Sequence, residues 1–369
     1  MDMVRKHMKV LIEEALDAEL TSYLGCSRYD RSSDRKDWRN GYYTRDFATG
    51  MGVIKAIRVP RSRRKGFETR LFARYQRRHK QVEELIRKLF FVGASTRAVG
   101  EVLELLAGFA PSATSVSMVV AQVDEQVRAF HERELGDEYV CLLLDGVSMK
   151  IKEAPHAVTR MVLVAYGIRA DGRRELIDYR VVRSESASEW ERFLTSLYRR
   201  GLTGKQLKVI TTDGSRGAIA ALGVVYPEVH RQLCWVHKLR NVERHLKAGQ
   251  KEACLSQAQE IYRADTRREA LAAWKRWRDR WKSEAPEAVE CLGKDLEALL
   301  TFLELPKPQH RIVRTTNYIE RLFREARRRT RLMGVFANKA SCDRMLYGLF
   351  ERVQRNWSRR PLIEFTQDT

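Results

Sequence analysis

Two aspartates each follow a run of residues typical of a strand and precede a glycine. Asp145 comes after Leu-Leu-Leu and before Gly146, and Asp213 comes after Val-Ile-Thr-Thr and before Gly214. Either pair alone is ordinary turn chemistry, because Asp-Gly commonly follows a strand. Carboxylates at two neighbouring strand ends would instead repel each other unless a divalent cation neutralised them. That arrangement is the one that two-metal phosphoryl transfer requires.

Such a site needs a third carboxylate, and the candidate is Glu320 in Thr-Thr-Asn-Tyr-Ile-Glu. With Asn317 as the residue that caps a helix, Glu320 stands at the position where a capping box places glutamate. It could also pair with Arg324, four residues later on the same helix. These residues alone do not decide between a helix cap and a metal ligand.

The elements around these acids are predicted by apolar runs and alternation. Five strands are expected, over 139–144, 157–168, 174–182, 207–212 and 231–236. A helix capped by Ser186 or Ser188 and a helix over 215–225 separate the last three strands. The order β-β-β-α-β-α-β is that of an RNase H-like mixed five-stranded sheet, in which the first and fourth strands are neighbours. Asp145 and Asp213 would then share one edge of the sheet.

Residues 240–309 are predicted to be entirely helical, and a last helical block runs from 317 to 357. Trp274, Trp277 and Trp281 recur at helical spacing in a basic context. They indicate either a helix–helix interface or a surface on which extruded bases stack.

The N-terminal part combines a helix over 4–25 with a basic arm. Residues 28–80 hold 17 Lys or Arg against 5 Asp or Glu, interleaved with aromatic residues and including a strand pattern over 53–60. Residues 81–132 are predicted to be helical. Ser95 caps a helix to about 106 and Ser112 caps a second to about 129, which resembles a helix-turn-helix. The arginines of the arm to which we assign DNA contacts are Arg63, Arg64, Arg77 and Arg78.

A second basic surface follows Glu320. Arg321, Arg324, Arg328 and Arg331 recur three or four residues apart, and Glu325 is the one acid within 321–331. The stripe is either a solvated helix face or a surface that contacts phosphates.

Composition narrows the classes of protein. Lys plus Arg is 69 against 48 Asp plus Glu, a net charge of +21, which favours nucleic acid as the partner. No apolar run approaches the ~20 residues of a membrane helix, and the first 14 residues resemble no signal peptide. The six scattered cysteines, without CxxC, favour a reduced, cytoplasmic location. Cys234 and His237 form only half of a zinc site, so zinc is not expected, and no P-loop indicates a nucleotide.

Short motifs across nearly the whole chain carry a family resemblance. They are Arg39-Asn40-Gly41-Tyr42, Pro60-Arg61-Ser62-Arg63, Tyr75-Gln76-Arg77-Arg78, Gly93-Ala94-Ser95-Thr96-Arg97, Glu185-Ser186 with Trp190 and Phe193, Arg200-Gly201-Leu202, Gln232-Leu233-Cys234-Trp235-Val236-His237-Lys238-Leu239-Arg240-Asn241 and Thr315-Thr316-Asn317-Tyr318-Ile319-Glu320, besides the two Asp-Gly pairs. On these motifs the sequence resembles the mutator-type transposases of bacterial insertion sequences, which are related to eukaryotic Mutator-like transposases.

The resemblance implies a catalytic triad of Asp145, Asp213 and Glu320 that binds two Mg²⁺ or Mn²⁺ ions. The separations are 68 and 107 residues, and the longer interval matches the family's all-helical insertion. Cys234, His237 and Asn317 are implied to lie near the active site. The implied partners are double-stranded DNA, as terminal inverted repeats and target, and a second copy in a homodimer. A nucleoid-associated protein of the bacterial cytoplasm is expected, with no membrane partner.

The expected activity is metal-dependent hydrolysis and strand transfer at the ends of the protein's own insertion sequence. The alternatives are a catalytically inactive DNA-binding regulator derived from a transposase, and a host nuclease or resolvase on the same fold. The expected segments are an N-terminal helix with a basic arm (1–80), a helix-turn-helix-like domain (81–135), an RNase H-like core in two parts (136–242 and 310–369) and an all-helical insertion (243–309).

Overall fold

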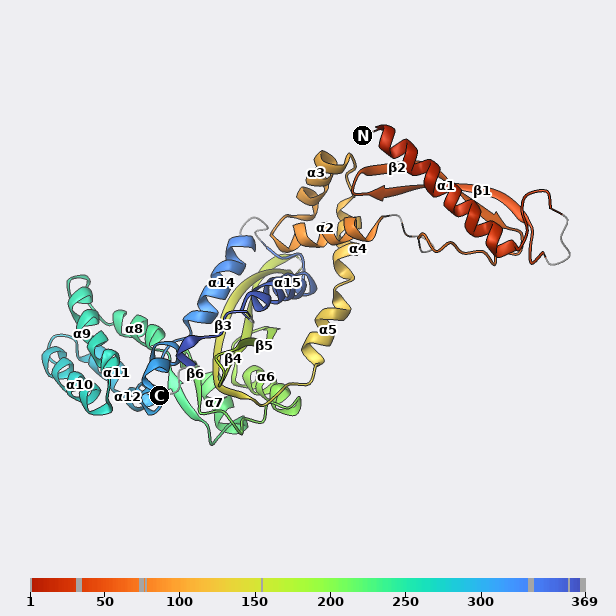
Figure 1. The fold of residues 1–369 in the computed structure, drawn as a ribbon. Coiled ribbons are helices and arrows are strands. Elements are labelled where there is room, and N and C mark those ends of the chain that lie inside the picture. Colours follow the sequence, from red (N-terminus) through yellow and green to blue (C-terminus); the bar gives the residue numbers. More distant parts are fainter. Residues whose placement is uncertain are drawn as a thin grey trace. The chain divides into compact units, whose positions relative to one another are not determined.

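The computed structural model describes residues 2–30, 35–72, 76, 78–153, 155–330, 335–357 and 359–365 of the chain. The chain divides into two compact units, Met1–Val123 and Asp124–Thr369 (Figure 1). The finer division into five segments stays a prediction.

The first unit begins with a long helix that covers a β-hairpin. Helix α1 (Asp2–Leu24) lies along strands β1 (Arg39–Thr49) and β2 (Gly52–Ser62), which pair antiparallel (Figure 1). Leu16 of α1 packs in one apolar cluster with Ile57 of β2. The basic arm is therefore a packed hairpin, and the predicted strand over 53–60 is its second half.

Three further helices complete this unit: α2 (Lys80–Phe91), α3 (Thr96–Ala107) and α4 (Ala113–Ala121). Ser95 caps α3 and Ser112 caps α4, each accepting a backbone N–H with its side chain as predicted. The expectation that the second helix continues to 129 is wrong. It ends at Ala121. A separate helix, α5 (Asp124–Glu132), follows and already belongs to the second unit, where its first residue, Asp124, pairs with Arg344.

The second unit is built on a mixed five-stranded sheet. Its strands are β3 (Tyr139–Glu153), β4 (His156–Arg169), β5 (Arg174–Val182), β6 (Val209–Thr212) and β7 (His230–Leu233). They lie in the order β5-β4-β3-β6-β7. The first three pair antiparallel, whereas β6 is parallel to both β3 and β7. The predicted strand succession is confirmed, and so is the adjacency of the first and fourth strands.

Two predicted strand ends are wrong by three residues or more. Strand β3 does not end before Asp145 but continues to Glu153, because β4 offers a partner to every residue as far as His156. Asp145 and Gly146 are therefore paired strand residues and form no turn. Strand β7 ends at Leu233 rather than 236, because the chain turns there into a helix that begins at Trp235.

Helices cover both faces of this sheet. On one face, α6 (Ala187–Arg199) and α7 (Arg216–Val225) pack their apolar side chains against Leu142 and Leu144 of β3. On the other face, α14 (Asn317–Thr330) and α15 (Lys339–Trp357) lie against the strands. Side chains alternate along a strand, so neighbouring residues of β3 face different helices.

Between β7 and α14 the chain is helical. The helices are α8 (Trp235–Glu243), α9 (Lys251–Arg263), α10 (Arg267–Trp281), α11 (Pro286–Gly293), α12 (Leu296–Leu300) and α13 (His310–Val313). Short 3-10 turns occur at Ala248–Gln250, Thr301–Glu304, Lys307–Gln309 and Ile363–Phe365. Helices α8 to α11 pack on one another (Figure 1). No helix within the described residues is long and apolar enough to cross a membrane.

The tryptophans of α10 form a helix–helix interface. Trp277 and Trp281 are only 2% and 3% exposed, and their indole N–H groups donate to Cys254 O and Gln257 Oε1 of α9. Trp274 stacks on Trp277 with ring centroids 5.4 Å apart. Buried rings with satisfied donors are unavailable to bases, so the packing interpretation of this stripe is correct.

Replacing Trp277 with Ala should destabilise the protein by about 3–5 kcal/mol, because the substitution leaves a large cavity in the interface. Chemical denaturation measures the loss. Trp274→Ala is the control and should cost less, since Trp274 is only partly buried. Equal losses would contradict the assignment.

Candidate active site

Asp145 and Asp213 come together where β6 ends. Strands β3 and β6 are parallel and in register, with Leu143 opposite Thr211. Asp145 stands two residues further along β3, and Asp213 directly follows the last residue of β6, so the register that predicts their proximity is present. Asp213 is close enough for its negative charge to raise the pKa of Asp145.

Asp145 has a buried carboxyl group, and few neighbouring groups stabilise its ionised form. Its side chain is 3% exposed, and its Oδ1 accepts the backbone N–H of Gly146 at 2.9 Å. Burial raises the pKa of Asp145 to about 7, and Asp213 adds to the effect. The positive charge of His237 and a hydrogen bond with Thr316 act in the opposite direction. Burial is therefore the main reason that the ionised form of Asp145 is disfavoured.

Asp213 is oriented by the turn that leads into α7. Its Oδ1 accepts the hydroxyl of Thr212 at 3.1 Å and the backbone N–H of Ser215 at 2.9 Å. Gly214 has a φ of +89°, which an L side chain rarely adopts, so glycine is needed at this turn. Ser215 in turn caps α7.

Glu185 is a further acid of the site that sequence reasoning missed. Its Oε1 accepts the hydroxyl of Ser215 at 2.9 Å and the indole N–H of Trp190 at 3.1 Å. Its carboxyl carbon lies 2.7 Å from the place that a Cβ on Gly146 would take. Burial and the charge of Asp213 raise the pKa of Glu185. The available signal was a carboxylate directly before the helix cap Ser186, within a motif that the resemblance already used.

Glu320 reaches this region because the end of the helical segment is attached to β6 and α8. Thr211 Oγ1 donates to Val313 O at 2.7 Å, and Trp235 N donates to Arg314 O at 3.0 Å. Thr316 N then donates to the sulfur of Cys234 at 3.3 Å. These bonds place the start of α14 beside the two aspartates across the long interval in sequence.

The capping role expected as one alternative for Glu320 is not observed. Helix α14 starts at Asn317, so the residue before the helix is Thr316, and Glu320 stands one position beyond that of a capping box. The Glu320 carboxylate instead faces two cations. Its Oε1 lies 2.6 Å from Arg240 Nη1 and 3.6 Å from His237 Nε2, and its Oε2 lies 3.4 Å from Arg240 Nη2.

The three predicted acids thus lie in one region. Asp145 and Asp213 interact through their charges, while Glu320 is paired with Arg240. Within the described ranges, no group of three or more His, Cys, Asp or Glu side chains stands ready to hold a metal ion.

His237 lies among all these groups. A hydrogen bond with Cys234 raises the pKa of His237 to about 9, and the charges of Asp145 and Asp213 contribute. Burial of the Cys234 thiol favours its neutral form, but His237 outweighs burial and lowers its pKa. His237 is accordingly a cation at neutral pH and supplies part of the positive charge that the acids need. Asn317, the third residue of the predicted motif, is the first residue of α14.

The arginine stripe of α14 is exposed at Arg321, Arg324 and Arg328. Arg328 is not free, since it makes two 3.0 Å hydrogen bonds to Glu325. Arg331 lies outside the described residues.

The first unit carries a separate basic surface. Arg63 and Arg64 are exposed at the end of β2, and the Arg64 guanidinium lies 5.5 Å from the ring centre of Trp38. Arg78 is half-buried beside Ala48, and Arg77 lies outside the described residues.

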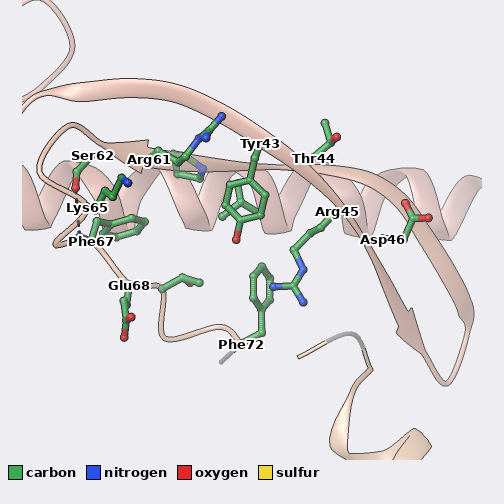
Figure 2. Close-up of a pocket in the computed structure, with 13 residues that line it drawn as sticks. Tyr43, Thr44, Arg45, Asp46, Arg61, Ser62, Lys65, Phe67, Glu68 and Phe72 are labelled. Carbon is green, nitrogen blue, oxygen red and sulfur yellow. Dashed lines mark hydrogen bonds between the residues drawn. The ribbon is translucent and has the colours of Figure 1, made fainter. Parts of the chain in front are cut away.

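A groove of about 860 Å³ runs along the same hairpin (Figure 2). Arg45 lies over the ring of Phe72 at 4.4 Å, and Arg61 lies over that of Tyr43 at 5.7 Å. Lys65 also lines the groove. Guanidinium groups beside aromatic rings suit a nucleic-acid backbone and its bases. Interleaved basic and aromatic residues are expected in this arm, but Arg45, Arg61 and Lys65 are not among the residues predicted to contact DNA.

The pKa of Asp145 has a measurable consequence for stability. Because it rises from 3.8 to about 7 on folding, the penalty for the ionised form is absent below the lower value and complete above the higher one. Asp145→Asn should therefore stabilise the metal-free protein by on the order of a few kcal/mol at about pH 8, and by less at about pH 5. Denaturation with a chelator present measures this.

The control is Asp178→Asn, at a buried aspartate that pairs with Arg200 and His131. This variant should destabilise the protein. A gain for Asp145→Asn that is equal at both pH values would contradict the assigned shift.

The chain is similar to known insertion-sequence transposases along nearly its full length. Residues 1–360 match the family described as "Transposase, Mutator family". The transposase for insertion sequence element ISRM5 of Rhizobium meliloti is 35% identical over 356 residues, covering 96% of this chain and 89% of that protein. The transposase for element IS905 of Lactococcus lactis is 29% identical, covering 97% and 91%. That for IS256 in transposon Tn4001 of Staphylococcus aureus is 28% identical, covering 99% and 94%. The family match and the first of these similarities establish that the chain belongs to the Mutator family of transposases.

Proposed function

We propose that this protein is a DNA transposase that cleaves and joins phosphodiester bonds at the inverted-repeat ends of its own insertion sequence. The observation that carries the proposal is the meeting of Asp145 and Asp213 where the parallel strands β3 and β6 part. The strand order β5-β4-β3-β6-β7, with helices on both faces, supports an RNase H-like core for the second unit.

The donor set of the site fits hard divalent cations. Mg²⁺ and Mn²⁺ favour carboxylate oxygens, and Asp145 is a buried carboxylate in need of positive charge. Asp145 and Asp213 would hold two such ions, with Glu320 as the third ligand. When bound, the ions stabilise the attacking and leaving oxygens of the phosphoryl transfer.

The chain's own residues prepare this site. The Ser215 backbone N–H and the Thr212 hydroxyl orient Asp213, and Glu185 holds Ser215 in place. His237 keeps a positive charge among the acids until the ligands are complete.

DNA is the proposed partner of both units. The groove along β1 and β2 and the exposed Arg63 and Arg64 would engage the inverted repeat. Arg321 and Arg324 on α14 would contact phosphates near the cleaved bond. We also propose that the protein is a homodimer associated with the bacterial nucleoid. This part of the proposal rests on the family resemblance and on the net charge of +21.

The inactive regulator is the less favoured candidate, because all three carboxylates are retained and two of them adjoin. Replacing Asp145, Asp213 or Glu320 with Ala should abolish Mg²⁺-dependent cleavage and strand transfer on DNA that carries the element's ends. Binding to those ends should persist, because the groove is in the first unit. Full cleavage by Asp213→Ala would refute the assigned triad.

A chain that starts at Asp124 should lose its preference for the inverted repeat over random DNA while still binding DNA through the second unit. It must keep α5, because Arg133 of the segment after this helix donates to Ile177 O at 2.8 Å and supports β5. Competition binding measures the preference. If the truncated chain prefers the inverted repeat over random DNA as strongly as the full chain does, the first unit does not recognise the repeat.

A further inference from the structure

Arg240 occupies a position that the proposed chemistry has not used. It lies on α8, three residues after His237, and its side chain is 53% exposed. Its guanidinium faces the Glu320 carboxylate through both terminal nitrogens, and it also interacts with the charge of Asp145. An arginine thus stands at the open side of the acidic site, tied to one of the three proposed ligands.

This pairing conflicts with a loaded site. Glu320 cannot serve a cation held by Asp145 and Asp213 while both of its oxygens face Arg240. If Glu320 turns toward the aspartates, the Arg240 guanidinium loses its anion beside the place where a DNA phosphate must lie. One change therefore frees a carboxylate for the cation and a guanidinium for the nucleic acid.

We propose that Glu320 and Arg240 exchange partners when the site is loaded, an inference that rests on the proposed function. The Glu320 carboxylate leaves the guanidinium and joins Asp145 and Asp213 on the divalent cation. The freed Arg240 binds a backbone phosphate of the DNA. Cation binding and DNA binding then promote each other through this one ion pair, and the coupling is reciprocal.

The exchange suits both side chains. The Arg240 side chain is 53% exposed and that of Glu320 is 23% exposed, so water reaches the pair from the arginine side. An ion pair open to water contributes only modestly to stability, so we expect its separation to cost little. A guanidinium binds phosphate with the same two-pronged geometry as carboxylate, so Arg240 needs no new shape to change partners.

The first test measures DNA affinity against salt concentration in a chelator, with a random-sequence duplex as the probe. Glu320→Gln frees Arg240 without any cation, so the slope of log affinity against log salt should steepen by about 0.9, the value for one phosphate contact. In an Arg240→Gln background the same substitution should leave the slope unchanged. An equal steepening in both backgrounds would show a general charge effect and overturn the exchange.

A matched control is the exposed pair of Arg267 and Glu297 in the helical segment. Glu297→Gln also removes the negative charge that faces an arginine, but at a position far in sequence from Asp145 and Asp213. It should leave the salt dependence of DNA affinity as it is in the unaltered protein. A change as large as that for Glu320→Gln would contradict the role of Arg240.

The second test measures Mn²⁺ affinity by electron paramagnetic resonance, with and without the duplex. Duplex should tighten Mn²⁺ binding severalfold in the unaltered protein. Arg240→Gln should tighten it without DNA and remove the effect of DNA. If the unaltered protein binds Mn²⁺ and DNA independently, the exchange is wrong while the proposed function stands. If Mn²⁺ binding survives in the variant with both Asp145→Asn and Asp213→Asn, the proposed site itself is wrong.

Discussion

The candidate active site depends on a few hydrogen bonds between two segments that are far apart in the chain. Thr211 bonds to Val313, Trp235 to Arg314, and Cys234 to Thr316. Each bond satisfies a backbone group at the end or the start of a helix, where the regular intrahelical hydrogen bonds have stopped. Without these bonds the first turn of α14 would have no fixed relation to β3 and β6. The third acid would then not share a site with the other two.

The site also illustrates how a protein keeps like charges together. Asp145 is buried by the same strand that forms the middle of the sheet, so it cannot move away from Asp213. The fold compensates with cations that do not belong to the strands, His237 and Arg240 from α8. Helix α8 exists at this point because the chain leaves β7 at Leu233 and turns into a helix at once.

Sequence patterns predicted most of the second unit's sheet, since strand succession follows from apolar runs, and the approach of Asp145 to Asp213 follows from register. They failed where a partner decided the outcome. The uninterrupted apolar run ends at Leu144, yet β3 continues to Glu153 because β4 pairs with it throughout. In this second half only every other residue is apolar, namely Val147, Met149 and Ile151, and these are buried. Glu185 was missed although it stands in a motif of the family resemblance, because its hydrogen bond from Ser215 and its place beside Gly146 depend on the folded structure.

The helical segment between β7 and α14 leaves and rejoins the sheet at nearly the same place. The buried Gln232 donates to Leu299 O at 2.9 Å and accepts from Phe302 N at 2.7 Å, so the segment is closed at its base by one side chain. The entropy of closing a loop grows only slowly with its length, by about 0.6 kcal/mol for each doubling. A segment closed in this way can lengthen, shorten or be exchanged for another helical module during evolution while the chemistry at its base remains undisturbed.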